Sequence, residues 1–288
     1  MHERDEIRVG IVGAGRLGAS LAGGLARAGY HVSVIASASL ESAEALSRNL
    51  DRAPAATDLL GDAARLADLI LLTVPDSRVA DVCGAIPWTA SHIAAHCSGA
   101  LGLPILAAAT ERGAAVGCLH PLQTFPSRSP EPERFEGVYC GIEGAPPAGA
   151  ILDRIAKDLR AIPFRLEGVD RAKYHAAAVM ASNLVVALAS AAGRLWELAG
   201  LDAGAGRQAL APLTLAAAQN VANMELAQAL TGPVARGDVE TVARHLRALE
   251  EDATLLELYR MLSTELLRLP LGHDAATARE LAELLGGD

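Results

Sequence analysis

The sequence contains few aromatic residues and no cluster of basic side chains. Aromatic residues make up 3% of the 288 residues, and 25 Lys and Arg are outnumbered by 34 Asp and Glu, which gives a net charge of -9. A protein that binds nucleic acid needs clustered Lys and Arg for the phosphates and, for single strands, aromatic rings for base stacking. The composition therefore argues against a nucleic-acid partner.

Cysteine is also scarce, and its spacing points to no metal site. Cys83, Cys97, Cys118 and Cys140 form no CxxC pair and each lies in an apolar segment, which predicts buried thiols in a reducing compartment. The histidines show no metal-ligand spacing either. We expect no metal. Because the charged start MHERDEIRV leads directly into a strand without a signal peptide, we expect a cytoplasmic location.

One uncharged segment, residues 176–193, is about as long as a membrane-spanning helix. It consists mostly of alanine and carries Ser182, Asn183 and Ser190, and the chain has no second segment of this kind. A helix buried within a helical domain or a dimer explains the segment better than a membrane span does. We expect no membrane association.

The first half of the sequence alternates short β-like runs with segments of helical periodicity. The expected strands are 7–12, 31–36, 69–74, 92–97, 114–119, 138–142 and 163–166. The expected helices between them are 17–28, 40–50, 77–85, 103–112 and 148–159. Such alternation is typical of βαβ units and predicts an α/β fold, a doubly wound and mainly parallel sheet with helices on both faces.

No strand is expected after Gly168, where the sequence becomes helical throughout. One long helix is expected over 171–199, followed by helices over 206–230, 239–249, 253–269 and 275–285. The sequence therefore predicts two domains, an α/β domain over residues 1–168 and an all-helical domain over residues 169–288.

The strongest motif is Gly13-x-Gly15-x-x-Gly18, which lies between the first expected strand and the first expected helix. Gly13 permits a tight turn, Gly15 lets the backbone approach a pyrophosphate, and Gly18 lets the helix pack against the strand. The phosphates would then bind free N–H groups at the helix N-terminus. We expect a dinucleotide site that includes Arg16 and Leu17; a glycine-rich turn that serves packing alone is the alternative.

The end of the second expected strand indicates which dinucleotide binds. NAD sites usually carry Asp or Glu here for the ribose hydroxyls, whereas this chain has the segment ASAS, with Ser37 and Ser39. No carboxylate is present to repel a 2′-phosphate. NADP is therefore the expected cofactor, with Ser37, Ser39 and Arg16 as phosphate contacts.

Three consecutive strands end in residues suited to a reaction centre, namely Val74-Pro75, Ser98 and His120. In a doubly wound sheet the carboxyl ends of the strands border the ligand crevice, so the three ends should meet beside the reactive ring of the cofactor. His120 has a suitable intrinsic pKa for exchanging a proton with a substrate oxygen, and Ser98 would orient His120 or the substrate. The alternative is that both residues make structural hydrogen bonds only.

The long helix expected over 171–199 carries a polar stripe. At about 100° per residue, His175 and Ser182 lie on nearly the same face, and Asn183 lies at its edge. Buried polar groups must be hydrogen-bonded, so the stripe either contacts a ligand or is satisfied by its neighbours. His175 and Asn183 are therefore candidate catalytic residues.

Candidate substrate contacts lie in two loops. Gln123 and Thr124 follow the third of the strand ends. Arg236 precedes Asp238, a good N-cap for the helix expected over 239–249. An arginine in this place binds a substrate carboxylate or pairs with the cap carboxylate, and the sequence leaves both open.

Six segments together resemble one bacterial protein family: VGAGRLGASLA, LLTVPDSRVADV, HCSGALG, GCLHPLQTFP, YHAAAVMASNLVVAL and ALTGPVARGDVETVARHL. That family has a Rossmann-like N-terminal domain and a helical C-terminal domain of unknown function. It is similar in architecture to pyrroline-5-carboxylate reductase and ketopantoate reductase. The resemblance implies a homodimer through the helical domain, with the active site between cofactor and helices.

The chain differs from related dehydrogenases at one catalytic position and resembles prephenate dehydrogenases at two. Related dehydrogenases often carry a catalytic Lys four residues before an Asn, but Val179 holds that position before Asn183. Prephenate dehydrogenases carry a His-Pro and a preceding catalytic Ser, which His120 and Ser98 match. The expected function is an NADPH-dependent oxidoreductase that transfers a hydride to a small carbonyl acid such as ketopantoate. The alternatives are pyrroline-carboxylate-type imine reduction, prephenate-like oxidation and a non-catalytic NADPH sensor.

Overall fold

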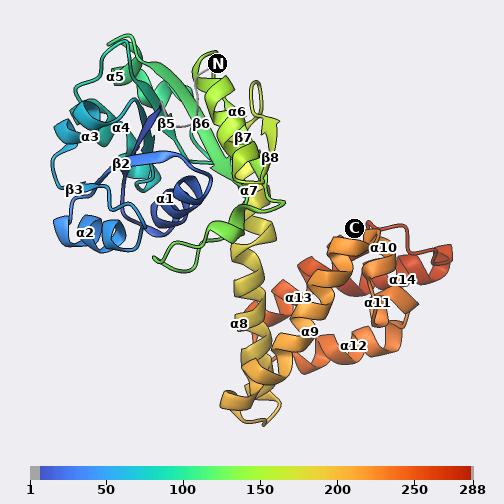
Figure 1. Ribbon diagram of the computed structural model, residues 1–288. Helices are drawn as coiled ribbons and strands as arrows, with labels where there is room; N and C mark the ends of the chain where they lie inside the picture. The colour runs from blue at the N-terminus through green and yellow to red at the C-terminus, as the bar shows by residue number, and fades with distance from the viewer. Residues whose placement is uncertain (1–6, 287–288) are drawn as a thin grey trace. The chain divides into compact units, whose positions relative to one another are not determined.

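The structure is a computed structural model that describes residues 7–286 (Figure 1). The chain forms two compact units, which divide between Ser182 and Asn183. The N-terminal unit contains all the described strands, and the described part of the C-terminal unit is helical.

The N-terminal unit is built on one eight-stranded sheet with the order β3-β2-β1-β4-β5-β6-β7-β8. The strands are β1 (Arg8–Val12), β2 (His31–Ala36), β3 (Ala55–Thr57), β4 (Leu69–Leu72), β5 (Ile93–His96), β6 (Ala115–Pro121), β7 (Tyr139–Glu143) and β8 (Ile162–Arg165). Neighbouring strands are parallel except β6 and β7, which are antiparallel. The doubly wound, mainly parallel sheet predicted from the sequence is therefore confirmed.

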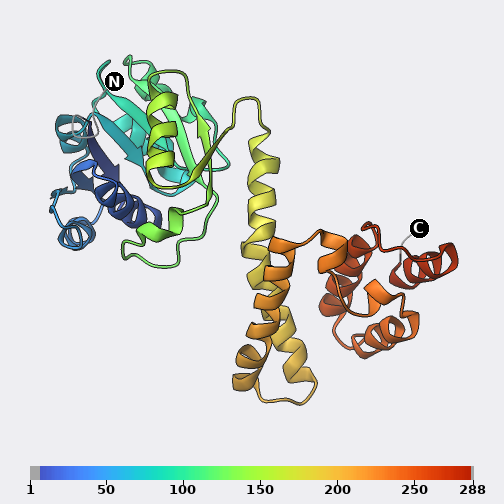
Figure 2. The ribbon, with the colours of Figure 1, turned by 45° about the vertical axis from the view of Figure 1, so that its right-hand side comes forward.

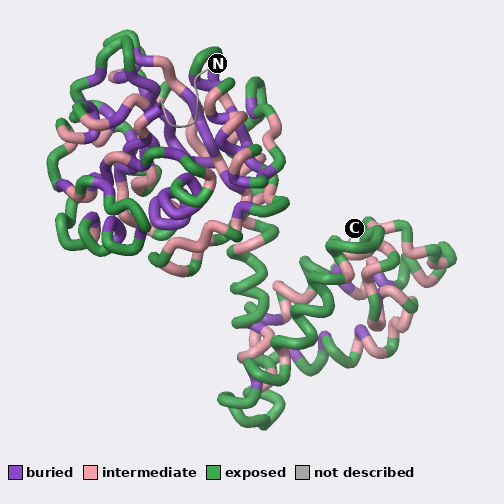
Figure 3. The backbone as a smooth tube through the Cα atoms, viewed as in Figure 1, coloured by how far each residue is buried: buried purple, intermediate pink, exposed green. Residues whose placement is uncertain are grey.

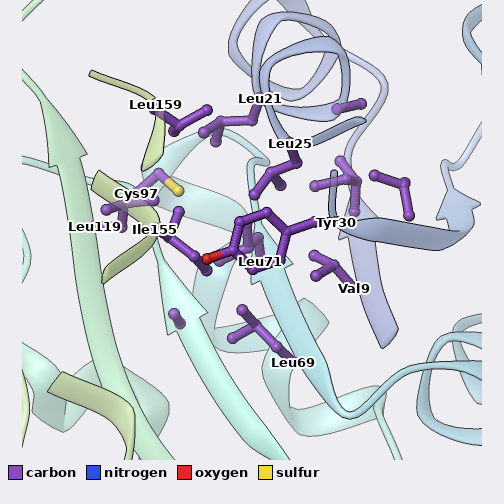
Figure 4. Close-up of a cluster of buried hydrophobic side chains, with 14 of the residues drawn as sticks. Val9, Leu21, Leu25, Tyr30, Leu69, Leu71, Cys97, Leu119, Ile155 and Leu159 are labelled. Atoms are coloured by element: carbon purple, nitrogen blue, oxygen red, sulfur yellow. The ribbon is translucent and has the colours of Figure 1, made fainter. Parts of the chain in front are cut away.

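Helices cover both faces of this sheet (Figures 1 and 2). They are α1 (Arg16–Arg27), α2 (Leu40–Arg48), α3 (Leu60–Leu66), α4 (Val79–Ala85), α5 (Ala107–Thr110) and α6 (Ala148–Asp158), with 3₁₀ turns η1 (Asp76–Arg78), η2 (Leu103–Leu106) and η3 (Pro132–Phe135). Helix α7 (Arg171–Ala181) follows β8 and has no buried residue. Leu69 and Leu71 of β4 belong to the core cluster shared with α1, α2 and α6 (Figure 4). Ile70 and Leu72 belong to the opposite cluster, shared with α3, α4 and α5. Because β4 is buried on both faces, its sequence is a continuous apolar run.

The sequence patterns did not predict the edge strand β3 and helix α3. β3 has only three residues and pairs along one side with β2. Thr57 ends the strand, accepting the Leu59 N–H at 3.0 Å and donating to Asp62 at 2.8 Å. Three residues are too few to show a β alternation, so only pairing with β2 defines the strand.

The C-terminal unit contains α8 (Asn183–Leu198), α9 (Ala203–Asn223), α10 (Leu226–Ala229), α11 (Pro233–Arg236), α12 (Val239–Ala248), α13 (Ala253–Leu266) and α14 (Ala275–Leu285). Its larger buried cluster is formed by Val234, Val242, Leu246, Leu281 and Leu285. Helices α8 and α9 are mostly exposed instead (Figure 3). Their exposed large apolar residues are Leu184, Val185, Val186, Leu188, Leu195 and Leu198 in α8, and Leu213, Leu215 and Val221 in α9.

The helices differ from the sequence prediction at two places. The helix expected over 171–199 is interrupted at Ser182, which has φ -129° and ψ -75°. The Ser182 hydroxyl donates to the Ala178 carbonyl oxygen at 2.6 Å, and a hydroxyl bonded in this way bends helices. The helix expected over 206–230 is divided between α9 and α10, because Met224 adopts an extended backbone.

Ser182 also ends the compact N-terminal unit, whereas the sequence placed the domain boundary at Gly168. The strands do end before Gly168, with β8. Helix α7 nevertheless belongs to the N-terminal unit, because Tyr174 hydrogen-bonds to β6 and Arg171 forms an ion pair with β7.

The segment Arg171–Leu198 is long and apolar enough to cross a membrane by length and composition. Only 6% of its most apolar window is buried. A single helix of this kind is weak evidence for a membrane span, because an exposed apolar face is equally what a subunit interface presents.

Candidate active site

The glycine motif forms a tight turn between β1 and α1. Gly13 has φ +117°, and a Cβ there would lie 2.9 Å from the Thr73 backbone. A Cβ on Gly18 would lie 2.0 Å from the Gly13 carbonyl oxygen. A side chain at residue 13 or 18 would therefore collide with neighbouring backbone, so packing by itself explains both glycines. A Cβ on Gly15 would meet no atom within 4 Å, so Gly15 borders open space at the start of α1.

The space at Gly15 fits a pyrophosphate. Gly15 is the N-cap residue of α1, where no side chain caps the helix and no acidic residue lies in the first turn. The first N–H groups of the helix, which begins with Arg16 and Leu17, are therefore available to an anion, and the helix dipole favours a negative charge there. This arrangement suits the phosphates of a dinucleotide.

Ser37 and Ser39 lie beside this turn, at the carboxyl end of β2. The Gly13 N–H donates to the Ala36 carbonyl oxygen at 2.8 Å, which joins the two loops. Ser39 caps α2 by accepting the Ser42 N–H at 3.2 Å, and Ser37 accepts the Ser39 N–H at 3.4 Å. Both hydroxyl groups accept a local hydrogen bond and keep their own proton to donate to a phosphate.

Ser98 lies next to the end of β4 and is held by Asp76. The Ser98 hydroxyl donates to an Asp76 carboxylate oxygen at 2.6 Å and accepts the N–H groups of Ala100 and Leu101 at 3.1 Å each. The Ser98 proton is therefore directed to Asp76. Asp76 directly follows the strand end Val74-Pro75, and a carboxylate at that place is a sequence signal for this contact.

His120 lies in β6 and its ring lies close to the Gly99 backbone. A Cβ on Gly99 would lie 2.7 Å from the His120 Nε2 atom and 2.8 Å from the His175 Nδ1 atom. The two imidazoles are edge to face, with ring centroids 6.2 Å apart. The structure thus brings together His120 and His175, two of the predicted catalytic residues, with one nitrogen of each close to Gly99.

The other nitrogen of His120 contacts a residue that the sequence reading missed. The His120 Nδ1 atom lies 2.6 Å from the Tyr174 hydroxyl oxygen. Tyr174 directly precedes His175 in the first turn of α7. A tyrosine adjacent to a candidate histidine was the available signal, but 54 positions separate it from His120.

Burial and neighbouring cations determine the protonation of this cluster. Burial lowers the pKa of His120 to about 4, with contributions from His175 and Arg171 and an opposing one from Asp76. Burial raises the pKa of the Tyr174 phenol to about 12. At neutral pH His120 is therefore an uncharged imidazole with one proton, and Tyr174 is an uncharged phenol.

Arg171, at the start of α7, forms an ion pair with Glu143 of β7, at 2.9 Å between Nη2 and Oε2. The side chain of Arg171 is 10% exposed and that of Glu143 is 19% exposed. The Arg171 Nε and Nη1 atoms are buried and make no hydrogen bond to the described residues. Glu143 is thus the main compensation for a buried guanidinium charge.

We expect Glu143→Gln to destabilise the protein by about 3 kcal/mol, because removing one partner leaves the other charge buried without compensation. Urea unfolding measures the change. Arg171→Met combined with Glu143→Gln should cost less than the two single changes together. Fully additive effects would contradict a direct pair.

The free energy of unfolding should also decrease as the pH is lowered, because His96 and His120 have lowered pKa values in the folded protein. Burial lowers the pKa of His96, like that of His120, to about 4 from an ordinary value of 6.5. The unfolded chain then binds more protons than the folded one between these values, so stability present above about pH 6.5 is lost as the pH falls toward 4. Urea unfolding at about pH 7.5 and about pH 5 measures this loss. His96→Gln should reduce it, whereas a change at the exposed His31 should not.

The remaining predicted contacts are exposed residues. Gln123 and Thr124 are exposed, and the Gln123 amide oxygen accepts the Thr124 N–H at 2.8 Å. Asn183 and Arg236 are exposed residues of the C-terminal unit. Asp238 caps α12 through the Thr241 N–H, which lowers the pKa of its carboxyl, and the Arg236 charge adds to that effect.

Two family models match the chain. Residues 2–121 match a Rossmann-like domain, and residues 138–266 match DUF2520, a domain of unknown function. The second match begins next to β7, so it includes the last two strands as well as the helices through α13. No curated protein sequence matches the chain.

Solved structures share this architecture over nearly the whole chain. A candidate NADP oxidoreductase from Bacteroides fragilis, BF3122, is 25% identical, with 91% of this chain and 98% of that one covered and a TM-score of 0.75. Protein TM1727 from Thermotoga maritima is 26% identical, with 96% and 98% covered and a TM-score of 0.71. A pyrroline-5-carboxylate reductase from Coxiella burnetii is 17% identical, with 96% and 98% covered and a TM-score of 0.59, and shares the fold. The chain is therefore similar to a Rossmann-like domain over residues 2–121 and to DUF2520 over residues 138–266, in agreement with the architecture that the six sequence segments predicted.

Proposed function

We propose that the protein is an NADP-dependent oxidoreductase that transfers a hydride to a small carbonyl acid, with ketopantoate as the first candidate substrate. The observation that carries the proposal is the combination of an open dinucleotide turn at Gly15 with a half-buried, uncharged His120 in the same sheet. The similarity to an NADP oxidoreductase from Bacteroides fragilis supports the cofactor class.

The cofactor-binding residues and the proton donor have separate roles in this proposal. The turn at Gly15 and the N-terminus of α1 bind the pyrophosphate, and Ser37 and Ser39 bind the 2′-phosphate. The nicotinamide supplies the hydride when the cofactor is bound. His120 donates a proton from Nε2 to the substrate oxygen as charge develops there.

Ser98 acts by shaping the pocket in this proposal. Its hydroxyl proton is directed to Asp76, and its oxygen accepts two backbone N–H groups of the following turn. Ser98 therefore fixes the loop that contains Gly99, against which the rings of His120 and His175 lie.

Turnover tests the function directly. Purified protein is mixed with NADPH and a panel that contains ketopantoate, other small 2-oxo acids and cyclic imino acids, and NADPH oxidation is followed by absorbance. Oxidation with a 2-oxo acid supports the proposal. Oxidation with imino acids alone supports the imine reductase instead. Tight NADPH binding without turnover on any member of the panel supports a sensor.

Cofactor affinity tests the assignment of Ser37 and Ser39. The expected result is tighter binding of NADPH than of NADH, because no carboxylate lies at the end of β2 to repel the 2′-phosphate or to hold the ribose hydroxyls. Equal affinities would overturn the role given to the two serines. Titration of protein fluorescence with each nucleotide measures both constants.

We further propose a homodimer in the cytoplasm. The exposed apolar side chains of α8 and α9 form a surface that a second copy of the chain would cover. The four cysteines are free and buried, which suits a reducing compartment. Light scattering on the purified protein tests the first point, and a monomer at micromolar concentration would overturn it. Fractionation of the source cells tests the second.

A further inference from the structure

We infer that Tyr174 is a positioning residue for His120: its phenol donates to Nδ1 and thereby holds the imidazole proton on Nε2, the nitrogen on the Gly99 side of the ring. This inference rests on the proposed function for its catalytic consequence. Its structural part, the tautomer of His120, can be measured without any substrate.

The contact between the two side chains is short and well oriented. The Tyr174 hydroxyl oxygen lies 2.6 Å from the His120 Nδ1 atom, and the rings are nearly perpendicular, with centroids 5.4 Å apart. Helix α7 presents Tyr174 in its first turn, which Asp170 caps by accepting the Lys173 N–H at 3.1 Å. The Phe164 ring of β8 packs against the Tyr174 ring edge to face at 6.0 Å. The phenol is therefore held from the helix and from the sheet.

Two glycines make room for this arrangement. Gly141 pairs with His120 across β6 and β7, and a Cβ on Gly141 would lie 3.2 Å from the Tyr174 hydroxyl oxygen. A Cβ on Gly99 would meet the opposite edge of the imidazole at Nε2. The imidazole thus has a phenol at Nδ1, and a side chain at position 99 would collide with its Nε2 edge.

The direction of the hydrogen bond follows from counting protons. An uncharged imidazole carries one proton, and a phenol carries one. If Nδ1 carried the imidazole proton, it would donate to the Tyr174 oxygen, and the phenol proton would have no acceptor among the described residues. If Tyr174 donates instead, Nδ1 accepts the phenol proton and Nε2 carries the imidazole proton. His120 is only half-buried, so solvent or a ligand can accept the Nε2 proton, whereas the first arrangement leaves the phenol proton without an acceptor in the described part of the chain.

The surroundings keep both groups uncharged. The titratable and charged residues around the pair are Asp76, His96, Cys118, Cys140, Arg171 and His175. Burial and the cations lower the pKa of His120 to about 4, and burial raises that of Tyr174 to about 12. At neutral pH neither group competes for the other's proton in the resting state.

His120 and Tyr174 together supply the proton that a carbonyl reduction needs. The substrate carbon gains a hydride from the reduced nicotinamide, and the π electron pair moves to the oxygen, which takes the Nε2 proton. The Tyr174 proton moves to Nδ1, so the imidazole stays uncharged. Tyr174 is left as a phenolate next to the Arg171 guanidinium and regains a proton from solvent.

Nitrogen-15 NMR of the histidine side chains tests the inference on the cofactor-free protein. Wild-type His120 should show the Nε2–H tautomer at neutral pH, and Tyr174→Phe should give a mixture of tautomers. Tyr139→Phe is the matched control, because Tyr139 is exposed and its ring also packs against Phe164. An Nδ1–H tautomer or a charged imidazole in the wild type would overturn the inference without any variant.

Turnover provides the second arm of the test. Tyr174→Phe should lower kcat about ten- to a hundredfold, the worth of a lost buried hydrogen bond, with NADPH affinity unchanged. Unchanged kcat in a folded Tyr174→Phe protein would overturn the inference. Absence of turnover in the wild type counts against the proposed function instead, while the NMR result still decides the tautomer.

Discussion

Replacement of His120 with alanine should lower kcat by about 10² to 10⁴ and leave the affinity for NADPH unchanged, because His120 donates the proton but touches no residue of the nucleotide turn. Steady-state oxidation of NADPH and fluorescence titration measure the two quantities. His31→Ala is the control, since His31 is an exposed histidine at the start of β2 on the same sheet.

The result for His120→Ala distinguishes an NADPH-dependent enzyme from a non-catalytic NADPH sensor. A sensor needs the nucleotide turn but no acid, so its signal would survive the loss of His120. A fall in kcat together with a fall in NADPH affinity would indicate a structural defect, which thermal unfolding of the variant would reveal. Unchanged turnover in the folded variant would remove His120 from the mechanism.

Gly18→Ala and Gly15→Ala should have opposite effects, although both change one glycine of one motif. A Cβ on Gly18 would lie 2.0 Å from the Gly13 carbonyl oxygen, a backbone atom that cannot give way. We expect a loss of more than about 3 kcal/mol of stability, or no soluble protein. Gly15 has φ -82° and open space around it, so its alanine variant should fold within about 0.5 kcal/mol of the wild type.

The Gly15→Ala protein should instead bind NADPH at least about tenfold more weakly, which is about 1.4 kcal/mol, because its methyl group occupies the place of the pyrophosphate. Urea unfolding and nucleotide titration measure the two effects separately. If Gly15→Ala binds NADPH as the wild type does, the motif serves packing alone. If Gly18→Ala is stable, the packing of β1 against α1 is not as the structure has it.

Much of the fold was predictable because its signals are local. Residues 69–72 are a continuous apolar run because β4 is buried on both faces, and the glycine motif marks the turn between β1 and α1. Where the local signal is weak, the prediction failed. The three residues of β3 are defined only by pairing with β2, and the break at Ser182 follows from a hydroxyl that bonds to its own helix.

The candidate site was predictable only in part. His120, His175 and Ser98 could be selected by residue type and by position at strand ends or on a helix face. Asp76 at a strand end and Tyr174 beside His175 are visible in the sequence, but their positions do not show that Asp76 accepts the Ser98 proton or that Tyr174 contacts the His120 Nδ1 atom. Those contacts join different elements, and residue spacing carries no record of them.

By itself, then, the sequence determined the doubly wound sheet, the nucleotide turn and the change to helices after β8, because periodicity and glycine conformation act over a few residues. The tertiary structure decided which groups meet at the ends of β4, β5 and β6. Tyr174 is 54 positions from His120, and their contact exists because α7 packs its first turn against the antiparallel pair β6 and β7. The GCLHPLQTFP segment supplied a histidine, and the packing of α7 gave that histidine a partner and a direction for its proton.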